Sequence, residues 1–308
     1  MGWTVANMPD LTGKRVLITG ANSGIGYFAA VELARHGATV LLACRDPQRG
    51  AAALERLRLE VPAAQARLVQ LDLASLRSVQ AAADAELAHG LPLDCLLNNA
   101  GIMATPRRKE TEDGLELQFG TNVVGHFALT GRLLPALKLA TAARVVTVSS
   151  IAHKRGRIHF EDLQSLSRYS PTGAYYQSKL ADLMFALELE RRLRAAGTRI
   201  LSVGVHPGVA RTTLFKVGSG KGLARLAEQV IQATIGLLMN SDVDGALPTV
   251  YAACAPDVQG GGYYGPQGFL ETRGGDVGPA KIASQALDRE AQVRLWQMCE
   301  ALSGVRFL

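Results

Sequence analysis

The sequence predicts an α/β protein with a doubly wound parallel sheet. Strand-like apolar runs alternate with helical patterns as far as residue 205, and a glycine-rich turn joins the first run to the first helix. Buried strands that are separated by helices form parallel sheets covered on both faces. We therefore expect a Rossmann-type sheet of about seven strands in the order 3-2-1-4-5-6-7, followed by a C-terminal helical extension.

Predicted strands and helices follow one another along the first two thirds of the chain. The strand-like runs cover residues 14–20, 38–44, 67–72, 93–99, 144–150 and 199–205. The helical patterns cover 25–36, the stretch opened by Asp46 and Pro47, 75–89, 112–138 and 174–196. Asp46 and Pro47 are residue types that suit the cap and the first turn of a helix.

The pattern changes after residue 206. Apolar residues recur with a helical period over 208–240, and GGGYYGP at 260–266 indicates a turn and a last short strand. Residues 281–303 are predicted to form a final amphipathic helix. Because no linker or internal repeat appears, residues 1–308 are expected to form a single domain.

The composition narrows the class of protein. Hydrophobic residues make up 48% of the chain and charged residues 19%, which suits a packed globule and excludes disorder. The four cysteines show no metal-ligand spacing and the six histidines include no HExxH pair, so no metal site is expected. A reducing cytoplasm fits this cysteine usage, and neither a signal peptide nor a membrane-spanning run is expected. The net charge of +6 comes from scattered basic residues, which favours an anionic ligand and argues against a nucleic-acid partner.

A glycine-rich turn, TGANSGIG at residues 19–26, follows the first strand and opens the first helix. Gly20, Gly24 and Gly26 let the backbone turn tightly and approach a pyrophosphate, and the helix N-terminus directs free N–H groups toward it. The spacing differs from the common GxGxxG fingerprint. Its position after the first strand of a β/α repeat nevertheless favours dinucleotide binding over a purely structural turn.

The end of the second strand bears on the choice of cofactor. An acid there holds the ribose of NAD, and Asp46 lies at a nominally suitable spacing, but Pro47 makes Asp46 a better helix cap. Arg45 at the strand end is suited to the 2′-phosphate of NADP, although a solvated arginine is the alternative. Asp72 ends the third strand, where it either meets the adenine or caps the following helix.

Tyrosine, lysine and serine residues supply candidate reacting groups. Tyr175 and Lys179 lie four residues apart on one helix face, which favours Tyr175 over its neighbour Tyr176 without excluding the latter. A lysine cation favours the phenolate form of a nearby tyrosine. Ser149 and Ser150 end the fifth strand, where a hydroxyl can hydrogen-bond a carbonyl oxygen. No GxSxG elbow accompanies these serines, which argues against a serine hydrolase.

Asn122 is a polar residue in the middle of an otherwise apolar predicted helix. Gly120, Gly125 and Gly131 flank it, and each glycine costs a helix about 1 kcal/mol relative to alanine. Close packing or a functional break in the helix would explain this combination.

Together these motifs resemble the short-chain dehydrogenase/reductase superfamily over residues 13–275. The resemblance rests on TGANSGIG, NNAG (98–101), Asn122, VSS (148–150), YYQSK (175–179) and HPG (206–208). SKLADLMFALELERRL (178–193) and LWQMCEALSGV (295–305) are similar to the retinol dehydrogenase-like branch.

The resemblance implies a catalytic tetrad of Asn122, Ser150, Tyr175 and Lys179. Ser150 corresponds to the family serine because it is the second of the VSS pair. Tyr175 would act as acid and base, and Lys179 would bind the nicotinamide ribose and promote the phenolate. Asn122 would hold a water that links Lys179 to solvent.

The resemblance also implies a cofactor site. Its residues are Gly20, Asn22, Ser23, Gly24, Ile25, Gly26, Arg45, Asp72, Leu73, Asn99, Ala100, Gly101, Tyr175, Lys179, Pro207 and Gly208. The acid of NAD users aligns with Cys44 and is therefore absent, whereas Arg45 matches the basic position of NADP users. We expect NADP(H) in preference to NAD(H).

The expected activity is reversible hydride transfer between NADP(H) and an apolar carbonyl or alcohol that is retinoid-like, steroid-like or a long-chain aldehyde. The alternative is a catalytically idle NADP(H)-sensing protein on the same fold, against which the intact tetrad argues. Residues 13–205 would form the cofactor-binding core, 206–260 a substrate lid and 276–308 the helical extension. The lid carries apolar side chains, namely Leu214, Phe215, Leu223, Leu226, Val230 and Ile231.

Two expectations concern surfaces. The apolar stripe of 221–239 suits a lid better than contact with a membrane surface. Family members pair their counterparts of helices 112–138 and 174–196, which implies a homodimer or homotetramer, unless the C-terminal helix covers that surface and leaves a monomer.

Overall fold

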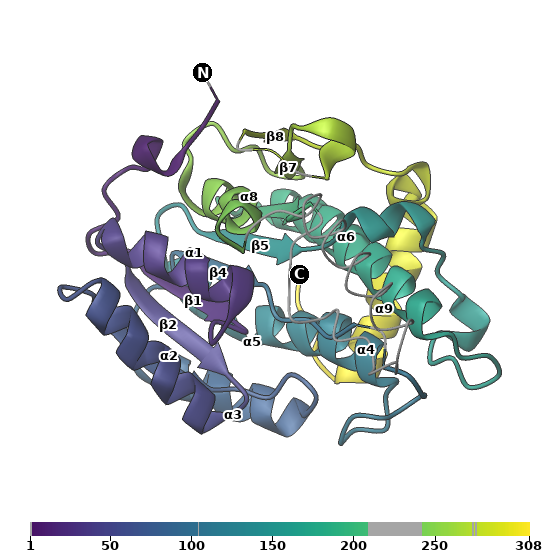
Figure 1. Cartoon of the computed structure of the whole chain (residues 1–308). Helices are drawn as coiled ribbons and strands as arrows, with labels where there is room; N and C mark the ends of the chain where they lie inside the picture. The colour runs from purple at the N-terminus through teal and green to yellow at the C-terminus, as the bar shows by residue number, and fades with distance from the viewer. Residues whose placement is uncertain (1, 104, 209–241, 273, 275) are drawn as a thin grey trace, which may run out of the picture.

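A computed structural model describes residues 2–103, 105–208, 242–272, 274 and 276–308, and it confirms the predicted fold (Figure 1). These residues contain one eight-stranded sheet in the order β3-β2-β1-β4-β5-β6-β7-β8. The strands are β1 (Arg15–Thr19), β2 (Thr39–Cys44), β3 (Ala66–Gln70), β4 (Cys95–Asn98), β5 (Arg144–Val148), β6 (Leu201–Val205), β7 (Tyr263–Pro266) and β8 (Val277–Pro279). The first seven are parallel in the predicted order, whereas β8 was not predicted and pairs antiparallel with β7.

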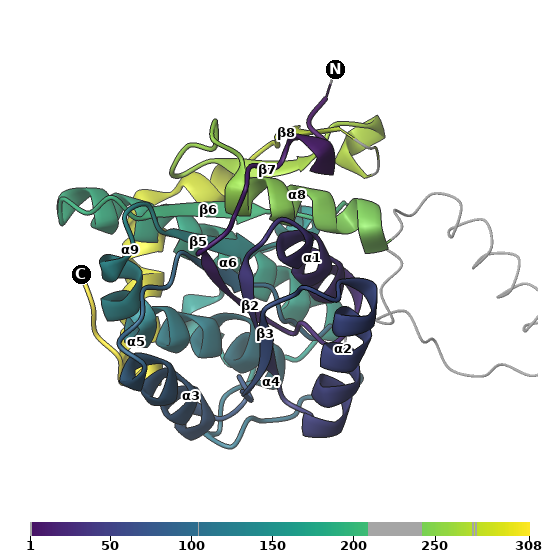
Figure 2. The ribbon, with the colours of Figure 1, turned by 90° about the vertical axis from the view of Figure 1, so that its left-hand side faces the viewer.

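Helices cover both faces of the sheet, as Figure 2 shows from the side. The helices are α1 (Gly24–Arg35), α2 (Pro47–Glu60), α3 (Leu76–Ala88), α4 (Leu117–Phe119), α5 (Gly125–Leu139), α6 (Pro171–Ala195), α8 (Asp242–Cys254) and α9 (Arg289–Ser303). The first apolar core joins one face of the sheet to α3, α5, α6 and α9. The second core joins the opposite face to α1, α2 and α8.

Local sequence explains where several helices begin. The Asp46 carboxylate accepts hydrogen bonds from the backbone N–H groups of Gln48 and Arg49, which confirms that it caps α2 ahead of Pro47. Ser170 caps α6 in the same way through the N–H of Gly173. These caps fix the helix starts that follow strand ends and loops.

The predicted helix over 112–138 is interrupted in the structure. The short helix α4 leads into a π-helical turn over Gly120–Val124, and α5 begins only at Gly125. The turn contains Asn122 and Gly120, a polar residue and a glycine that are both unusual inside an apolar helix. A break in the helix is therefore visible at Asn122, and such π-turns inside helices often occur at functional sites.

Part of the segment 206–260, which we expected to be a lid, is described. Residues 209–241 lie outside the described residues, and with them the apolar side chains from Leu214 to Ile231. The last part forms α8, which packs against α1. None of the described helices combines the length and apolar character needed to cross a bilayer.

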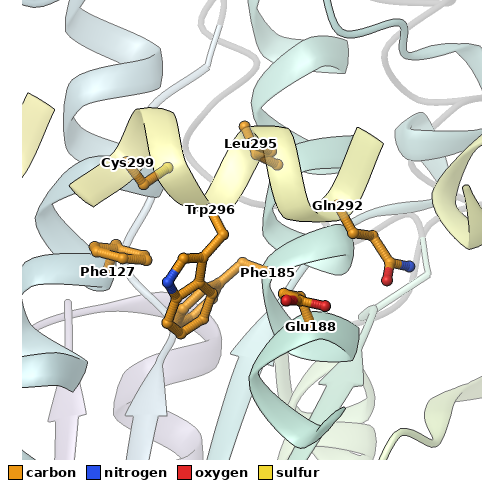
Figure 3. A pocket seen from close by; sticks show the side chains of 7 residues that line it. All are labelled: Phe127, Phe185, Glu188, Gln292, Leu295, Trp296 and Cys299. Carbon is orange, nitrogen blue, oxygen red and sulfur yellow. The ribbon is translucent and has the colours of Figure 1, made fainter. Parts of the chain in front are cut away.

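The C-terminal extension packs across α5 and α6 (Figures 1 and 3). Trp296 of α9 meets Phe127, Phe185 and Phe307 at ring-centroid distances of 4.9, 5.9 and 4.8 Å. A cavity of about 10 Å³, close to the size of one water, remains beside this aromatic cluster. It is lined by Phe127, Phe185, Glu188, Gln292, Leu295, Trp296 and Cys299. The helix thus covers part of α5 and α6, the two helices that the resemblance implies would pair between subunits, while the state of assembly stays a prediction.

Candidate active site

The site motifs gather at one edge of the sheet. The glycine turn follows β1, NNAG ends β4 and continues beyond it, Ser149 and Ser150 follow β5, and HPG follows β6. Because these four strands are parallel, their carboxyl ends lie at the same edge. This edge is where ligands bind in open α/β sheets.

The glycine turn forms a cradle with open space at its tip. Gly20 and Gly24 have φ angles of +68° and +55°, which side-chain-bearing residues rarely adopt. A Cβ on Gly26 would collide with the side-chain amide of Asn99, whereas one on Gly24 would meet nothing within 4 Å. Ser23 precedes α1 without a side-chain cap, so the first N–H groups of the helix lack this partner. The arrangement fits the diphosphate of a dinucleotide.

A buried hydrogen-bond network ties the cradle to the π-turn. The Thr19 hydroxyl accepts from the N–H groups of Asn99 and Ala100, both at 2.9 Å, and lies 2.9 Å from His126 Nε2. His126 Nδ1 lies 2.8 Å from the carbonyl oxygen of Asn122. Burial lowers the pKa of His126 to about 4, so the ring is neutral at pH 7. It therefore donates from Nδ1 to Asn122 and accepts from Thr19 at Nε2.

The Asn122 side chain joins two further segments. Its Oδ1 accepts from the N–H of Ile102 at 2.9 Å, and its Nδ2 donates to the Ile102 carbonyl and to Ser178 Oγ, both at 3.0 Å. Asn122 is fully buried. It holds the chain that follows NNAG against α6.

Lys179 lies next to Asn122 and NNAG. A Cβ built on Gly101 would be 3.6 Å from both Lys179 Nζ and Asn122 Oδ1. Lys179 Nζ donates to the carbonyl of Val148 at 2.9 Å and to Asp182 Oδ2 at 2.8 Å. The lysine therefore joins α6 to the end of β5, directly before the serine pair.

The two serines after β5 have different partners. Ser149 is buried, and its hydroxyl donates to the Lys179 carbonyl at 2.6 Å. Ser150 is half-buried, and its Oγ accepts from the N–H of Ala152 at 3.2 Å. The hydroxyl proton of Ser150 is thus free of that bond and can be donated, which favours Ser150 over Ser149 as the group that meets a substrate.

The tyrosine pair begins α6. Tyr175 and Tyr176 are both half-buried, and their ring centroids are 6.5 Å apart. Tyr175 contributes to the electrostatic stabilisation of the Lys179 ammonium and raises the pKa of Lys179. This interaction supports Tyr175 as the partner of Lys179.

Comparison with known proteins decides the family. The short chain dehydrogenase family model matches residues 14–220. The chain belongs to this family. Mouse retinol dehydrogenase 14 is 40% identical over 305 residues, covering 95% of this chain and 86% of the relative. Mouse polyprenol dehydrogenase is 41% identical over 302 residues, covering 96% and 86%.

Solved structures agree with the family assignment. An uncharacterized protein from Mycobacterium paratuberculosis is 42% identical, with a TM-score of 0.81 over the full length of both chains. L-sorbose reductase from Gluconobacter frateurii, at 21% identity and a TM-score of 0.64, covers 83% of this chain and 95% of its own, and shares the fold. This short-chain dehydrogenase is therefore an oxidoreductase that uses a nicotinamide cofactor.

The residues predicted to meet the adenosine end of the cofactor lie at strand ends. Arg45 is exposed at the end of β2. Asp46 uses its second carboxylate oxygen to accept from Arg49 Nε at 3.0 Å, in addition to its capping bonds. Asp72 accepts from the N–H of Ala74 at 2.9 Å in a local turn, whereas Ser75 caps α3, so the expected capping role of Asp72 is wrong. Leu73 beside it is buried against Gly125.

The last predicted cofactor residues follow β6. Pro207 is half-buried, and Gly208 has a φ of +72°. The N–H of Gly208 donates to His206 Nδ1 at 3.2 Å. This bond turns the chain at the same sheet edge as the glycine cradle.

Three residues of the dehydrogenase site were not predicted from the sequence. They are Thr19, His126 and Asp182. His126 and Asp182 are polar residues within apolar helical stretches, which is the same signal that singled out Asn122. Thr19 gives no comparable signal, because its role depends on contacts with residues far away along the chain.

Proposed function

We propose that this chain is an NADP(H)-dependent short-chain oxidoreductase that interconverts an apolar carbonyl and its alcohol. The observation that supports the proposal most is the arrangement of Lys179 beside Asn122 and at the end of β5, where Ser150 follows. A reacting carbonyl needs a proton donor, a second hydrogen bond and a nearby positive charge. Tyr175, Ser150 and Lys179 would provide these three groups.

Each residue has a distinct part in the proposed reaction. Tyr175 would give its proton to the substrate oxygen during reduction and recover it during oxidation. Ser150 would donate a hydrogen bond that holds and polarises the same oxygen. The Lys179 cation would favour the phenolate of Tyr175. The glycine cradle and Lys179 would hold the nicotinamide dinucleotide, which supplies or accepts the hydride when bound.

The proposed cofactor choice gives a first test. NADPH should bind at least about tenfold more tightly than NADH, because a hydrogen bond from Arg45 to a charged phosphate contributes about 1.5–3 kcal/mol. Arg45→Gln should remove most of this preference by weakening NADPH binding alone. Fluorescence titration of both nucleotides measures the two affinities, and the preference should shrink as salt rises.

A matched control is an exposed arginine at the other end of α2. Arg58→Gln changes the net charge equally but lies in the last turn of the helix, so it should leave the NADPH preference intact. Equal affinities for NADPH and NADH in the unmodified protein would contradict the proposal and make Arg45 a solvated side chain.

The proposed substrate class gives a second test. The chain's relatives include proteins named retinol and polyprenol dehydrogenases, and the proposed lid carries apolar residues such as Leu214 and Phe215. Burying such side chains against a ligand contributes about 25 cal/mol per Å². Retinoid-like, steroid-like or long-chain carbonyls should therefore exceed short polar ones in kcat/KM.

A screen of aldehydes and ketones with NADPH measures this preference. A result in which sugars or short hydroxy acids give the highest kcat/KM would contradict the apolar substrate class. Cofactor binding without turnover of any carbonyl or alcohol would instead support the catalytically idle alternative.

A further inference from the structure

A buried ion pair involves the lysine of the proposed active site. Lys179 Nζ lies 2.8 Å from Asp182 Oδ2, and the two side chains are only 6% and 3% exposed. Both residues belong to α6, three positions apart. In the described structure the ammonium also donates to the uncharged carbonyl oxygen of Val148, so Asp182 is the charged partner of the two.

The electrostatics of the pair favour a charged lysine. Burial opposes the ammonium, but Asp182 and Tyr175 outweigh it and raise the pKa of Lys179 above its ordinary value. At Asp182, burial prevails over the attraction of Lys179 and raises the pKa of the carboxyl to about 6. The two balances differ because Tyr175 as well as Asp182 favours the lysine cation, whereas Lys179 alone favours the Asp182 carboxylate. At neutral pH both groups are charged and the ion pair is intact.

The groups that surround the pair from other elements do not replace this carboxylate. His126 of α5 is neutral at pH 7 because burial lowers its pKa to about 4. Burial raises the pKa values of Tyr263 on β7 and Cys299 on α9, so both stay protonated. Among the described residues, the carboxylate that bonds to Lys179 is that of Asp182.

The remaining hydrogen-bond capacity of the lysine is limited. A lysine ammonium has three N–H donors. Val148 and Asp182 use two of them in the described structure. Asp182 thus fixes the direction of the ammonium while leaving one donor for another ligand.

We propose that Asp182 is a positioning residue that keeps Lys179 protonated and anchored at the end of β5 throughout the working pH range. The proposal rests on the proposed function, in which the charged lysine supports Tyr175. Asp182 itself acts only through Lys179.

The first experiment measures the lysine directly. The chain contains eight lysines, so NMR of protein labelled with ¹³C at lysine Cε gives few signals. The Lys179 signal is the one that Lys179→Arg removes. In the unmodified protein it should titrate no lower than the ordinary lysine pKa of about 10.4. In Asp182→Asn, which keeps the shape of the side chain, it should titrate about one to three pH units lower.

Glu188→Gln provides a matched control on the same helix. Glu188 is buried and paired with Arg191 and Arg192 at 2.5 and 2.7 Å, so its neutralisation also breaks an ion pair of α6. It is bonded to arginines and not to Lys179, and the Lys179 titration should stay unchanged.

The second experiment is the pH profile of kcat for alcohol oxidation. At alkaline pH, kcat should fall once Lys179 loses its proton. In Asp182→Asn, the pH at which this fall occurs should be at least about one unit lower than in the unmodified enzyme. Asp182→Glu, which restores a carboxylate, should return the profile toward the original. A purely structural role would lower kcat equally at every pH and would overturn the proposal.

Two further results would overturn it. One is a Lys179 titration that is the same in Asp182→Asn as in the unmodified protein. The other is an unmodified protein in which Lys179 titrates well below its ordinary range, a measurement that decides the matter even if Asp182→Asn does not fold. Because the NMR titration needs no turnover, an absence of activity would refute the proposed function without affecting this test.

Discussion

Tyr175→Phe is expected to lower kcat by about 10²–10⁴-fold, the usual contribution of a positioned acid or base. The substitution removes the hydroxyl that would exchange a proton with the substrate oxygen and keeps the ring that packs at the start of α6. Binding of NADPH should remain, because the glycine cradle and Lys179 are unchanged. Steady-state kinetics together with fluorescence titration of NADPH measure both quantities.

Tyr176→Phe is the matched control for this prediction. Tyr176 is also half-buried, and its ring centroid is 6.5 Å from that of Tyr175. It should retain most of the activity. If Tyr176→Phe were inactive and Tyr175→Phe active, the assignment of the acid–base group to Tyr175 would be wrong.

Trp296→Ala is expected to lower the free energy of unfolding by about 3–5 kcal/mol, the usual cost of removing a large buried aromatic side chain. Trp296 is 2% exposed, the Arg192 guanidinium lies 4.3 Å from its ring centroid, and its Nε1 donates to Glu300. The substitution would also enlarge the existing cavity beside it. Chemical denaturation followed by circular dichroism measures the change.

Leu139→Ala serves as the control for stability. Leu139 ends α5 and is 62% exposed, so its replacement should change the free energy of unfolding by no more than about 0.5 kcal/mol. A loss below about 1 kcal/mol in Trp296→Ala would show that α9 contributes little to the core.

The sequence predicted β1, β2, β4, β5 and β6 because each is a largely buried apolar run that needs no context to recognise. It did not predict β8, which has only three residues, a valine, a glycine and a proline. It also missed α8, since Gly245 and Pro248 lie inside that helix and both disfavour it. The final helix begins at Arg289 and not near 281, because a separate 3₁₀ turn over Ser284–Leu287 precedes it.

The site was predictable to the extent that its residues form local motifs. The glycine turn, NNAG and the tyrosine–lysine pair each lie within a few residues. The network of Thr19, His126 and Asn122 was not predictable, because Thr19 and His126 are 107 positions apart and meet only when β1 and α5 pack together. Asp182 lies only three residues from Lys179, but spacing alone does not tell a buried pair from a solvated one.

The position of α9 has a consequence for biosynthesis. The ribosome makes α5 and α6 well before the last residues, so their apolar faces emerge while Trp296 and Phe307 are still missing. Exposed apolar surface on an incomplete chain promotes aggregation and binding by chaperones. The domain can therefore complete its core only after Trp296 and Phe307 have also emerged. A nascent chain that stops before α9 lacks the residues that shield this surface, however intact its cofactor cradle is.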